Sequence, residues 1–183
     1  GSSVDLNKKE KKIEIINNNA LKTFASYNLL RKMRAGVLVL GPLLAKYGTA
    51  KVSLPGGCSI GSRPIDLHLN ALKKMGANIK VKNGYIIASA KRGLKGCLIR
   101  FSKISVGATE NILIASCFAR GKTKLRNCSS EPEVQDLINF LKKLGCKINQ
   151  VGKRSIDVLG VKKLKPAIHR VIFDRIEAGT YII

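Results

Sequence analysis

The sequence predicts an α/β (α+β) fold built from repeated helix-strand-helix-strands units whose sheets surround buried helices. Three similar segments indicate the repetition, because they begin at Ala35, Ala108 and Ala178, with spacings of 73 and 70 residues. Gly48 and Gly121 follow the first two of these alanines by the same 13 residues. A long fixed period of this kind is typical of an architecture that repeats one supersecondary unit.

A buried helix and a short strand are predicted to open each unit. Residues 37–45 and 112–119 are apolar on most sides, which favours helices enclosed within the domain. Residues 51–53 and 124–126 follow them as short strand-like runs. The same two elements are therefore expected in the same order in both copies.

An amphipathic helix is predicted next. Apolar residues recur at helical spacing at Val134, Leu137, Ile138, Leu141 and Leu144. The earlier copy repeats this pattern at Ile65, Leu69, Leu72 and Met75, while His68 takes the remaining position. We expect His68 to be a hydrogen-bonded residue at the edge of the core rather than a catalyst.

Two or three strands are predicted to close each unit. Both amphipathic helices run into a glycine, in Leu72-Lys-Lys-Met-Gly76 and Leu141-Lys-Lys-Leu-Gly145. Short alternating runs follow, and Asn83-Gly84 between two of them is typical of a hairpin. These boundaries predict one partial domain over 1–183, divided into 1–34 (the end of a first unit), 35–107, 108–177 and 178–183 (the start of the next segment).

Composition limits the class of protein. The chain has 183 residues, is 45% hydrophobic and 25% charged, and therefore reads as one globular domain. The sequence contains no run of 18 apolar residues, so it predicts no membrane-spanning helix, and its first residues do not resemble a signal peptide. Five cysteines without a close pair, together with two histidines, favour reduced thiols in a cytoplasm and predict neither a metal site nor a cofactor.

The charge is strongly basic, with 34 Lys and Arg against 11 Asp and Glu and a net charge of +23. Nucleic-acid binding is one interpretation of such a balance. The basic residues are spread along the chain, however, and aromatic residues make up only 5% of it, so stacking platforms for bases are scarce. We expect no specific nucleic-acid partner, and an anionic small substrate would also benefit from this field.

The segment Leu54-Pro-Gly-Gly-Cys-Ser-Ile-Gly-Ser-Arg-Pro-Ile-Asp66 is the strongest candidate for a functional loop. It places Cys58 among three glycines and five residues before Arg63. Cationic charge nearby favours a thiolate, and an arginine can hold a phosphate through paired donors. The glycine-to-glycine spacing is four residues longer here than in the other copy, which is where a repeat unit would carry a binding loop. An inert cysteine in a glycine-rich turn is the alternative.

This loop, with Arg31-Lys-Met-Arg-Ala before it, resembles the UDP-N-acetylglucosamine 1-carboxyvinyltransferase family of enolpyruvyl transferases. Further matching segments are Lys103-Ile-Ser-Val-Gly-Ala-Thr-Glu-Asn, Glu131-Pro-Glu-Val and Asp174-Arg-Ile-Glu-Ala-Gly-Thr. The resemblance runs from about residue 25 to the end. It implies an inside-out α/β barrel of three helix-and-strand units in each of two domains.

The resemblance also implies an activity and its substrates. Members transfer the enolpyruvyl group of phosphoenolpyruvate to the 3-hydroxyl of UDP-N-acetylglucosamine, the first committed step of peptidoglycan synthesis, in the cytoplasm. That step serves cell wall biogenesis, cell shape and cell division, and the enzyme is the target of fosfomycin. By this resemblance Cys58 is the general acid, and the residues that bind substrate are Arg34, Arg63, Pro64, Ile65, Asp66, Leu67, Lys103, Ile104, Ser105 and Val106.

Structural roles are the alternatives at several of these positions. Asp66 is expected to cap a helix if it does not bind nucleotide, and Lys103 is otherwise an ordinary surface lysine. Glu131 and Glu133 are first-turn acids that a helix dipole favours.

The family's Lys-Asn pair near the N-terminus and its second domain, which carries a catalytic aspartate and further arginines, find no match here. We therefore expect part of a first domain, inactive without the missing second domain. A non-catalytic nucleotide-sugar-binding remnant and a basic nucleic-acid-binding protein stay open as alternatives.

Overall fold

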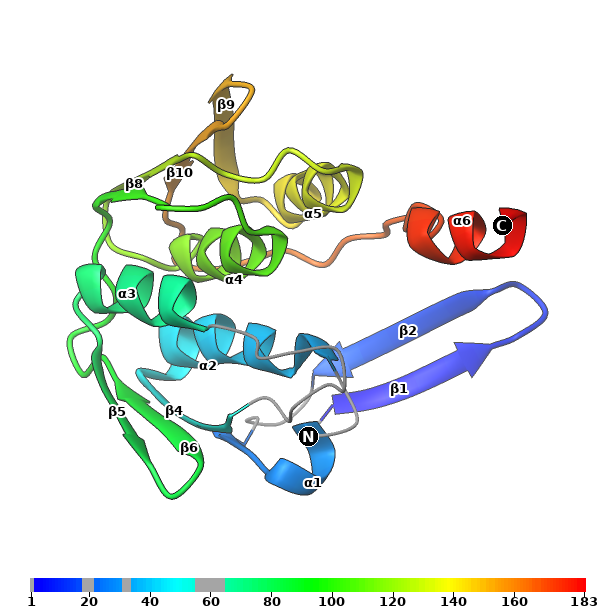
Figure 1. Cartoon of the computed structure of the whole chain (residues 1–183). Helices are drawn as coiled ribbons and strands as arrows, with labels where there is room; N and C mark the ends of the chain where they lie inside the picture. Colours follow the sequence, from blue (N-terminus) through cyan, green and yellow to red (C-terminus); the bar gives the residue numbers. More distant parts are fainter. Residues whose placement is uncertain (1, 18–21, 31–33, 55–64) are drawn as a thin grey trace.

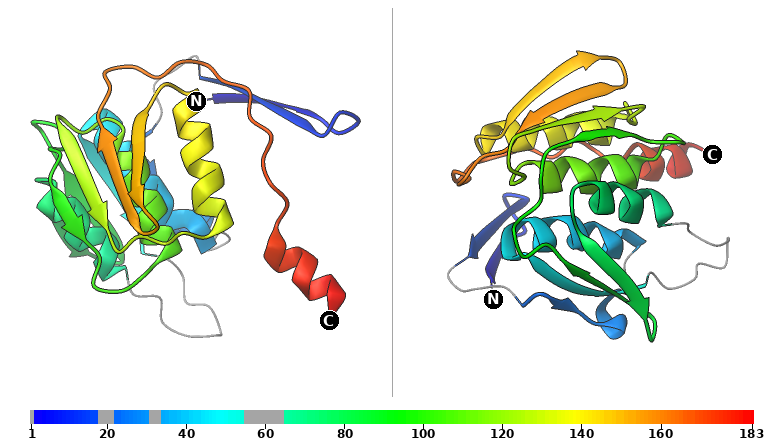
Figure 2. Two further views of the ribbon diagram at one scale, coloured as in Figure 1. Left: turned by 90° about the horizontal axis from the view of Figure 1, so that it is seen from above. Right: turned by 90° about the vertical axis from the view of Figure 1, so that its left-hand side faces the viewer.

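The computed structural model describes residues 2–17, 22–30, 34–54 and 65–183 (Figure 1). It contains two four-stranded sheets of identical topology, with helices between them (Figures 1 and 2). The predicted arrangement of sheets around buried helices is thereby confirmed.

The first sheet and its helices span residues 24–89. Their bounds are β3 Phe24–Ala25, α1 Tyr27–Leu30, η1 (a 3₁₀ helix) Arg34–Val39, α2 Leu40–Tyr47, β4 Thr49–Ser53, α3 Asp66–Lys74, β5 Asn78–Lys82 and β6 Tyr85–Ser89. The second sheet and its helices span residues 98–159. Their bounds are β7 Leu98–Arg100, α4 Val106–Ser116, β8 Lys122–Arg126, α5 Pro132–Lys143, β9 Lys147–Gly152 and β10 Ser155–Leu159.

Both sheets have the same strand order, β3-β4-β6-β5 and β7-β8-β10-β9. The first pair of each sheet is parallel, with Phe24 opposite Lys51 in one and Leu98 opposite Lys124 in the other, and the remaining pairs are antiparallel. The first strand of each sheet, β3 or β7, therefore lies before the alanine at which the sequence predicts the unit to begin, residue 35 or 108. The division at these residues stays a prediction, while the repetition of the unit is visible in the topology.

Gly76 and Gly145 follow the ends of α3 and α5, as the sequence indicates, and Gly48 follows the end of α2. Their φ values are 95°, 95° and 70°, and Gly121, directly before β8, has a φ of 87°. This left-handed conformation ends a helix at little cost only when there is no Cβ atom. Asn83 and Gly84 also have positive φ between β5 and β6, as the predicted two-residue hairpin requires.

The helix predicted at 37–45 is divided. Residues 34–39 form a 3₁₀ helix and α2 begins at Leu40. The cause is Asn111 on α4, whose Oδ1 accepts from the Gly41 N–H at 2.9 Å and whose Nδ2 donates to the Val37 carbonyl at 3.2 Å. An unbroken α-helix would bond that same N–H to that same carbonyl. A Cβ atom on Gly41 would lie 2.1 Å from Asn111 Oδ1, so the close approach needs a glycine.

The other predicted helices are present with shifted ends. The helix expected at 112–119 is α4, which begins at Val106 and ends at Ser116. It is the central helix, in contact with η1, α2, α3 and α5, and most of its side chains are buried. The expectation that Asp66 caps α3 is wrong, because Asp66 is the first helical residue and the N-cap position is held by Ile65, which has no polar side chain.

Two further segments lie outside the two sheets. The hairpin of β1 (Ser2–Asn7) and β2 (Lys12–Asn17) is exposed throughout and projects from the rest of the molecule (Figure 2). At the other end, residues 160–174 lead into α6 (Arg175–Ile182), which has no buried residue. Within the described residues, no helix is both long and apolar enough to span a membrane.

Residues 160–175 run along the whole of α5. The Lys165 N–H donates to the Leu144 carbonyl, and Lys143 Nζ donates to the Ile168 carbonyl. His169 Nε2 lies 2.9 Å from an Asp136 carboxylate oxygen. Arg175 then reaches the start of α5. The contacts follow the helix from its C-terminus to its N-terminus, so this segment is a strap over α5.

Candidate functional site

The predicted site residues fall on the starts of two helices. Ile65 precedes α3, and Asp66 and Leu67 are its first residues. Lys103, Ile104 and Ser105 precede α4, and Val106 is its first residue. Arg34 opens η1, whereas Cys58, Arg63 and Pro64 lie outside the described residues.

The structure brings the two helix starts together. A Cβ atom on Gly107, near the start of α4, would lie 3.6 Å from His68 Cε1, near the start of α3. In Figure 1, α2, α3, α4 and α5 all direct their N-terminal ends to the same side of the molecule. Helix N-termini carry partial positive charge and free N–H groups, so this end of the fold favours an anionic ligand.

The two helix starts differ in how their N–H groups are satisfied. Ser105 Oγ accepts from the Ala108 N–H at 3.2 Å, and Thr109 Oγ1 donates to the Ser105 carbonyl at 2.7 Å. α3 has no such side-chain cap, because Ile65 stands at its N-cap position. Its first N–H groups therefore have no side-chain acceptor among the described residues. Of these two helix starts, α3 is the one without a side-chain cap among the described residues, and it directly follows the Cys58 segment in sequence.

The residues at the two helix starts differ in how far they are exposed to solvent. Lys103 and Ile104 are exposed, while Ser105 and Val106 are half-buried. Asp66 is exposed, and Ile65 and Leu67 are half-buried. The charged side chains Asp66 and Lys103 thus lie at the surface, where a polar ligand could reach them.

A buried hydrogen-bond network supports this end of the fold. His68 Nδ1 lies 2.9 Å from Asn111 Nδ2. Because Asn111 Oδ1 already accepts from Gly41, the amide nitrogen must donate, so His68 Nδ1 is the acceptor and the imidazole is neutral. Burial lowers the pKa of His68 to about 4, although Asp66 raises it slightly. The prediction that His68 is a hydrogen-bonded residue of the core edge is confirmed.

The start of α5 carries acidic side chains close to α4. Burial raises the pKa of Glu110 on α4, and the charge of Glu133 raises it further. Arg175 Nε and Nη2 donate to the two Glu133 oxygens at 3.2 and 3.1 Å, and Nη2 also donates to Glu131 at 3.2 Å. This arginine lowers the pKa of Glu133. The sequence indicated the first-turn acids, but their partner lies 42 to 44 residues away and carried no local signal.

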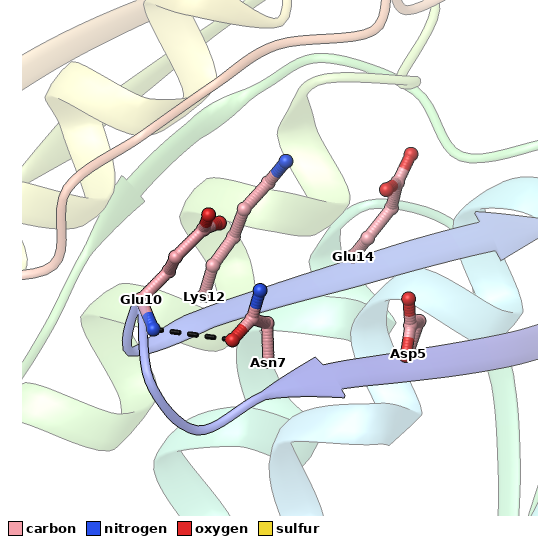
Figure 3. Close-up of a pocket in the computed structure, with 5 residues that line it drawn as sticks. All are labelled: Asp5, Asn7, Glu10, Lys12 and Glu14. Carbon is pink, nitrogen blue, oxygen red and sulfur yellow. Dashed lines mark hydrogen bonds between the residues drawn. The ribbon is translucent and has the colours of Figure 1, made fainter.

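The polar hollow on the β1–β2 hairpin is separate from this region (Figure 3). It has a volume of about 70 Å³ and is lined by Asp5, Asn7, Glu10, Lys12 and Glu14, side chains that project from one side of the hairpin. The Glu10 N–H donates to Asn7 Oδ1 at 3.1 Å. None of the predicted site residues lines it.

The described cysteines form no disulfide, and most of their thiols have a raised pKa. Burial raises the pKa of Cys97, and it raises that of Cys128 to about 11. A hydrogen bond with Cys146, followed by burial, raises the pKa of Cys117. The pKa of Cys146 is lowered by the same bond, but this residue is buried.

Comparison with known proteins gives a consistent result. The family model described as EPSP synthase (3-phosphoshikimate 1-carboxyvinyltransferase) matches residues 3–183. The UDP-N-acetylglucosamine 1-carboxyvinyltransferase of Pelagibacter ubique is 56% identical over 183 residues, which is 100% of this chain and 43% of that protein. The enzyme of the same name from Endomicrobium trichonymphae is 54% identical over 162 residues, covering 88% of this chain and 39% of that protein.

Solved structures agree on the fold. The enolpyruvyl transferase NikO from Streptomyces tendae superposes with a TM-score of 0.80 at 21% identity, covering 99% of this chain and 43% of that one. The EPSP synthase from Acinetobacter baumannii gives a TM-score of 0.66 at 19% identity, covering 90% of this chain and 37% of that one. The chain therefore spans less than half the length of the relatives it matches.

Proposed function

Because the chain belongs to the EPSP synthase family of enolpyruvyl transferases, we propose that it supplies part of the active site of a UDP-N-acetylglucosamine 1-carboxyvinyltransferase. The observation that carries this proposal is the 56% identity to a protein of that name, which extends over the whole chain. The shared position of the α3 and α4 starts supports it, since UDP-N-acetylglucosamine and phosphoenolpyruvate are both anionic. Nothing in the comparisons supports a binding remnant without catalysis or a nucleic-acid-binding protein.

In this proposal Cys58 is the general acid. The 3-hydroxyl of the sugar gives its proton to a base that we assign to the second domain and adds to C2 of phosphoenolpyruvate, while the thiol gives its own proton to the C3 methylene. A base then removes one proton from C3, the C2–O bond to phosphate breaks, and the C2–C3 double bond is restored. A thiol suits the first step when its pKa lies near the working pH. Arg63 stabilises the charge on the departing phosphate.

The nucleotide is proposed to bind across the two helix starts. We assign the first contact with the nucleotide to Ile65, Asp66 and Leu67 at the start of α3, together with Pro64 and Arg34. Lys103, Ile104, Ser105 and Val106 supply the second contact. The uncapped N–H groups of α3 would receive negative charge from the diphosphate. Peptidoglycan synthesis in the cytoplasm is the setting we propose for the reaction, with fosfomycin as an alkylating inhibitor of Cys58.

The test is release of phosphate from phosphoenolpyruvate in the presence of UDP-N-acetylglucosamine. A longer protein that contains this chain is expected to turn over, and Cys58→Ala should lower kcat by at least about 100-fold. Cys97→Ala is the matched control and should leave kcat within about twofold. Loss of activity in both variants, or in neither, would contradict the role given to Cys58.

The 183 residues alone are expected not to turn over. Catalytic groups misplaced by about 1 Å can cost about 10²-fold, and we propose that the opposing groups come from a second domain of the same protein. Turnover by this chain alone would show that the site is complete without that domain. Titration of UDP-N-acetylglucosamine into the chain, followed by NMR at the amides of residues 66–68 and 105–108, would show whether the nucleotide surface persists.

A further inference from the structure

An open cavity lies at the opposite end of α3 from the candidate site. It has a volume of about 380 Å³ and is lined by Gly76, Asn78, Ser89, Ala90, Lys91, Arg92, Gly93 and Lys95. The size is within the range of small-molecule sites. Gly76 lies two residues after the last residue of α3, whose nine residues span roughly 13 Å, so this cavity and the helix start at Asp66 are distinct places.

The charge around this cavity is unbalanced. Lys91, Arg92 and Lys95 are exposed, and none of them takes part in the salt bridges of the described residues. From Leu67 to Thr109 the sequence has nine lysines and arginines and no aspartate or glutamate. In the second sheet, by contrast, Asp157 lies between Lys122 and Arg126 and pairs with both. Three like charges around one hollow repel one another, and a bound anion would relieve this repulsion.

Neutral donors accompany the three cations. Asn78 on β5 pairs with Ser89 on β6, so their side chains emerge side by side from the sheet. Neither side chain makes a hydrogen bond within the described part of the chain, and both line the cavity. The cavity therefore offers hydrogen-bond donors from an amide, a hydroxyl, a guanidinium and two ammonium groups. Such donors suit the oxygens of a phosphoryl group.

The backbone holds the basic segment in a fixed position. The Gly93 N–H donates to the Ala90 carbonyl at 2.7 Å, and Gly93 has a φ of 71°. The Lys95 N–H donates to the Met75 carbonyl at 2.9 Å, directly after α3. Leu94 between these residues is buried. The cations therefore project from an anchored turn.

We propose that this cavity binds a phosphorylated small molecule, of the size of a nucleoside diphosphate or triphosphate, as a second anion site separate from the candidate active site. It does not depend on the proposed function. The same phosphate chemistry is present in a nucleic-acid backbone, and the experiment below separates the two sources.

The test is calorimetric titration of the chain with pyrophosphate, ATP and a single-stranded oligonucleotide at low salt. The triple variant Lys91→Gln, Arg92→Gln, Lys95→Gln is expected to bind ATP and pyrophosphate at least tenfold more weakly. The control Lys153→Gln, Lys162→Gln, Lys163→Gln removes the same charge from exposed positions in the second half of the chain. It should retain affinity within about twofold.

A second variant keeps all three cations. Asn78→Asp places a carboxylate in the cavity and should also weaken ATP binding, with amide shifts at Gly76 and Gly93 locating the ligand in the unaltered chain. An equal loss in the control variant would show that only the overall charge matters and would overturn the proposal. Binding of the oligonucleotide without ATP or pyrophosphate, or no binding of any probe, would overturn it too.

Discussion

The two sheet-and-helix units share one topology but differ in the connection that leads into their amphipathic helices. In the second unit, β8 joins α5 through residues 127–131, while in the first, β4 joins α3 through residues 54–65. α5 has 12 residues and α3 has nine, so the helix next to the longer connection starts later. The repeated scaffold therefore tolerates the longer connection, since the strand order and the glycines after α3 and α5 are the same in both units.

Polar residues in the core are also distributed unequally. At the repeat spacing, His68 occupies the place of Leu137 and Asn111 the place of Leu38. These two polar residues bond to each other and join η1, α2, α3 and α4. On the outer face of the sheets, Ile87 stands opposite Lys51 where Asp157 stands opposite Lys124. Each of these differences can be removed by substitution.

The largest effect is expected for Asn111→Leu, which makes α4 resemble the first unit. The Gly41 N–H, the Val37 carbonyl and His68 Nδ1 would each lose their buried partner. Unsatisfied buried groups cost about 1–3 kcal/mol each, so we expect a loss of about 4 kcal/mol in the free energy of unfolding, measured by urea denaturation. Asn149→Leu, at an exposed position on β9, is the control. Equal stability of the two variants would refute a structural role for the network.

A pH-dependent loss of stability is expected from His68. Its folded pKa of about 4 lies below the ordinary 6.5, so the unfolded chain binds the proton more readily. The stability that this group contributes is present above pH 6.5 and is lost as the pH falls toward 4. At 1.36 kcal/mol per unit this amounts to about 3 kcal/mol. His68→Leu should flatten the profile between pH 6.5 and 4, and an unchanged slope would contradict the neutral, buried imidazole.

The long connection of the first unit is expected to hold the most reactive thiol. Raised pKa values keep Cys97, Cys117 and Cys128 protonated near pH 7, and Cys146 is shielded by burial. We predict that limited alkylation, followed by mass mapping, labels Cys58 first and about 100-fold faster than Cys128. First labelling of Cys97 or Cys146 would count against a reactive Cys58.

A smaller effect is expected from Asp157→Asn on the outer face of the second sheet. The bond from Lys122, then that from Arg126, lowers the Asp157 pKa against the cost of burial. Its contribution is therefore present above the ordinary carboxyl pKa and is lost as the pH falls through the lower, folded value. We expect a loss of about 1.5 kcal/mol at pH 7 that disappears once the pH falls below the lowered pKa of Asp157. A loss independent of pH would point to packing instead of charge.

The smallest effect is expected at the helix starts. Ser105→Ala removes the cap of α4 and should lower the free energy of unfolding by about 1 kcal/mol, whereas Ser105→Gly should cost only a few tenths. The glycine variant is the matched comparison, because both substitutions remove the same Oγ. If Ser105→Ala and Ser105→Gly lose the same stability, or neither loses any, the capping role of Ser105 is wrong.

The sequence by itself determined the repeat, the amphipathic helices and the hairpin turns, because these depend on residues close together along the chain. Helical spacing of apolar residues and the glycines at 48, 76, 121 and 145 locate the elements without reference to distant contacts. The resemblance predicted binding residues at 65–67 and 103–106, and the structure places these two segments at the starts of α3 and α4. Their roles stay proposals, as do those of Cys58, Arg63 and Pro64, which lie outside the described residues.

Only the tertiary structure decided the polar partners. The bonds of Asn111 join residues 70, 74 and 43 positions apart, and those of Arg175 join residues 42 and 44 apart. No local pattern specifies such pairs, because an asparagine or arginine can find an acceptor in many places. The division of the helix at 34–47 has the same origin. Asn111 on α4 bonds both the Gly41 N–H and the Val37 carbonyl, which would bond each other in a regular α-helix.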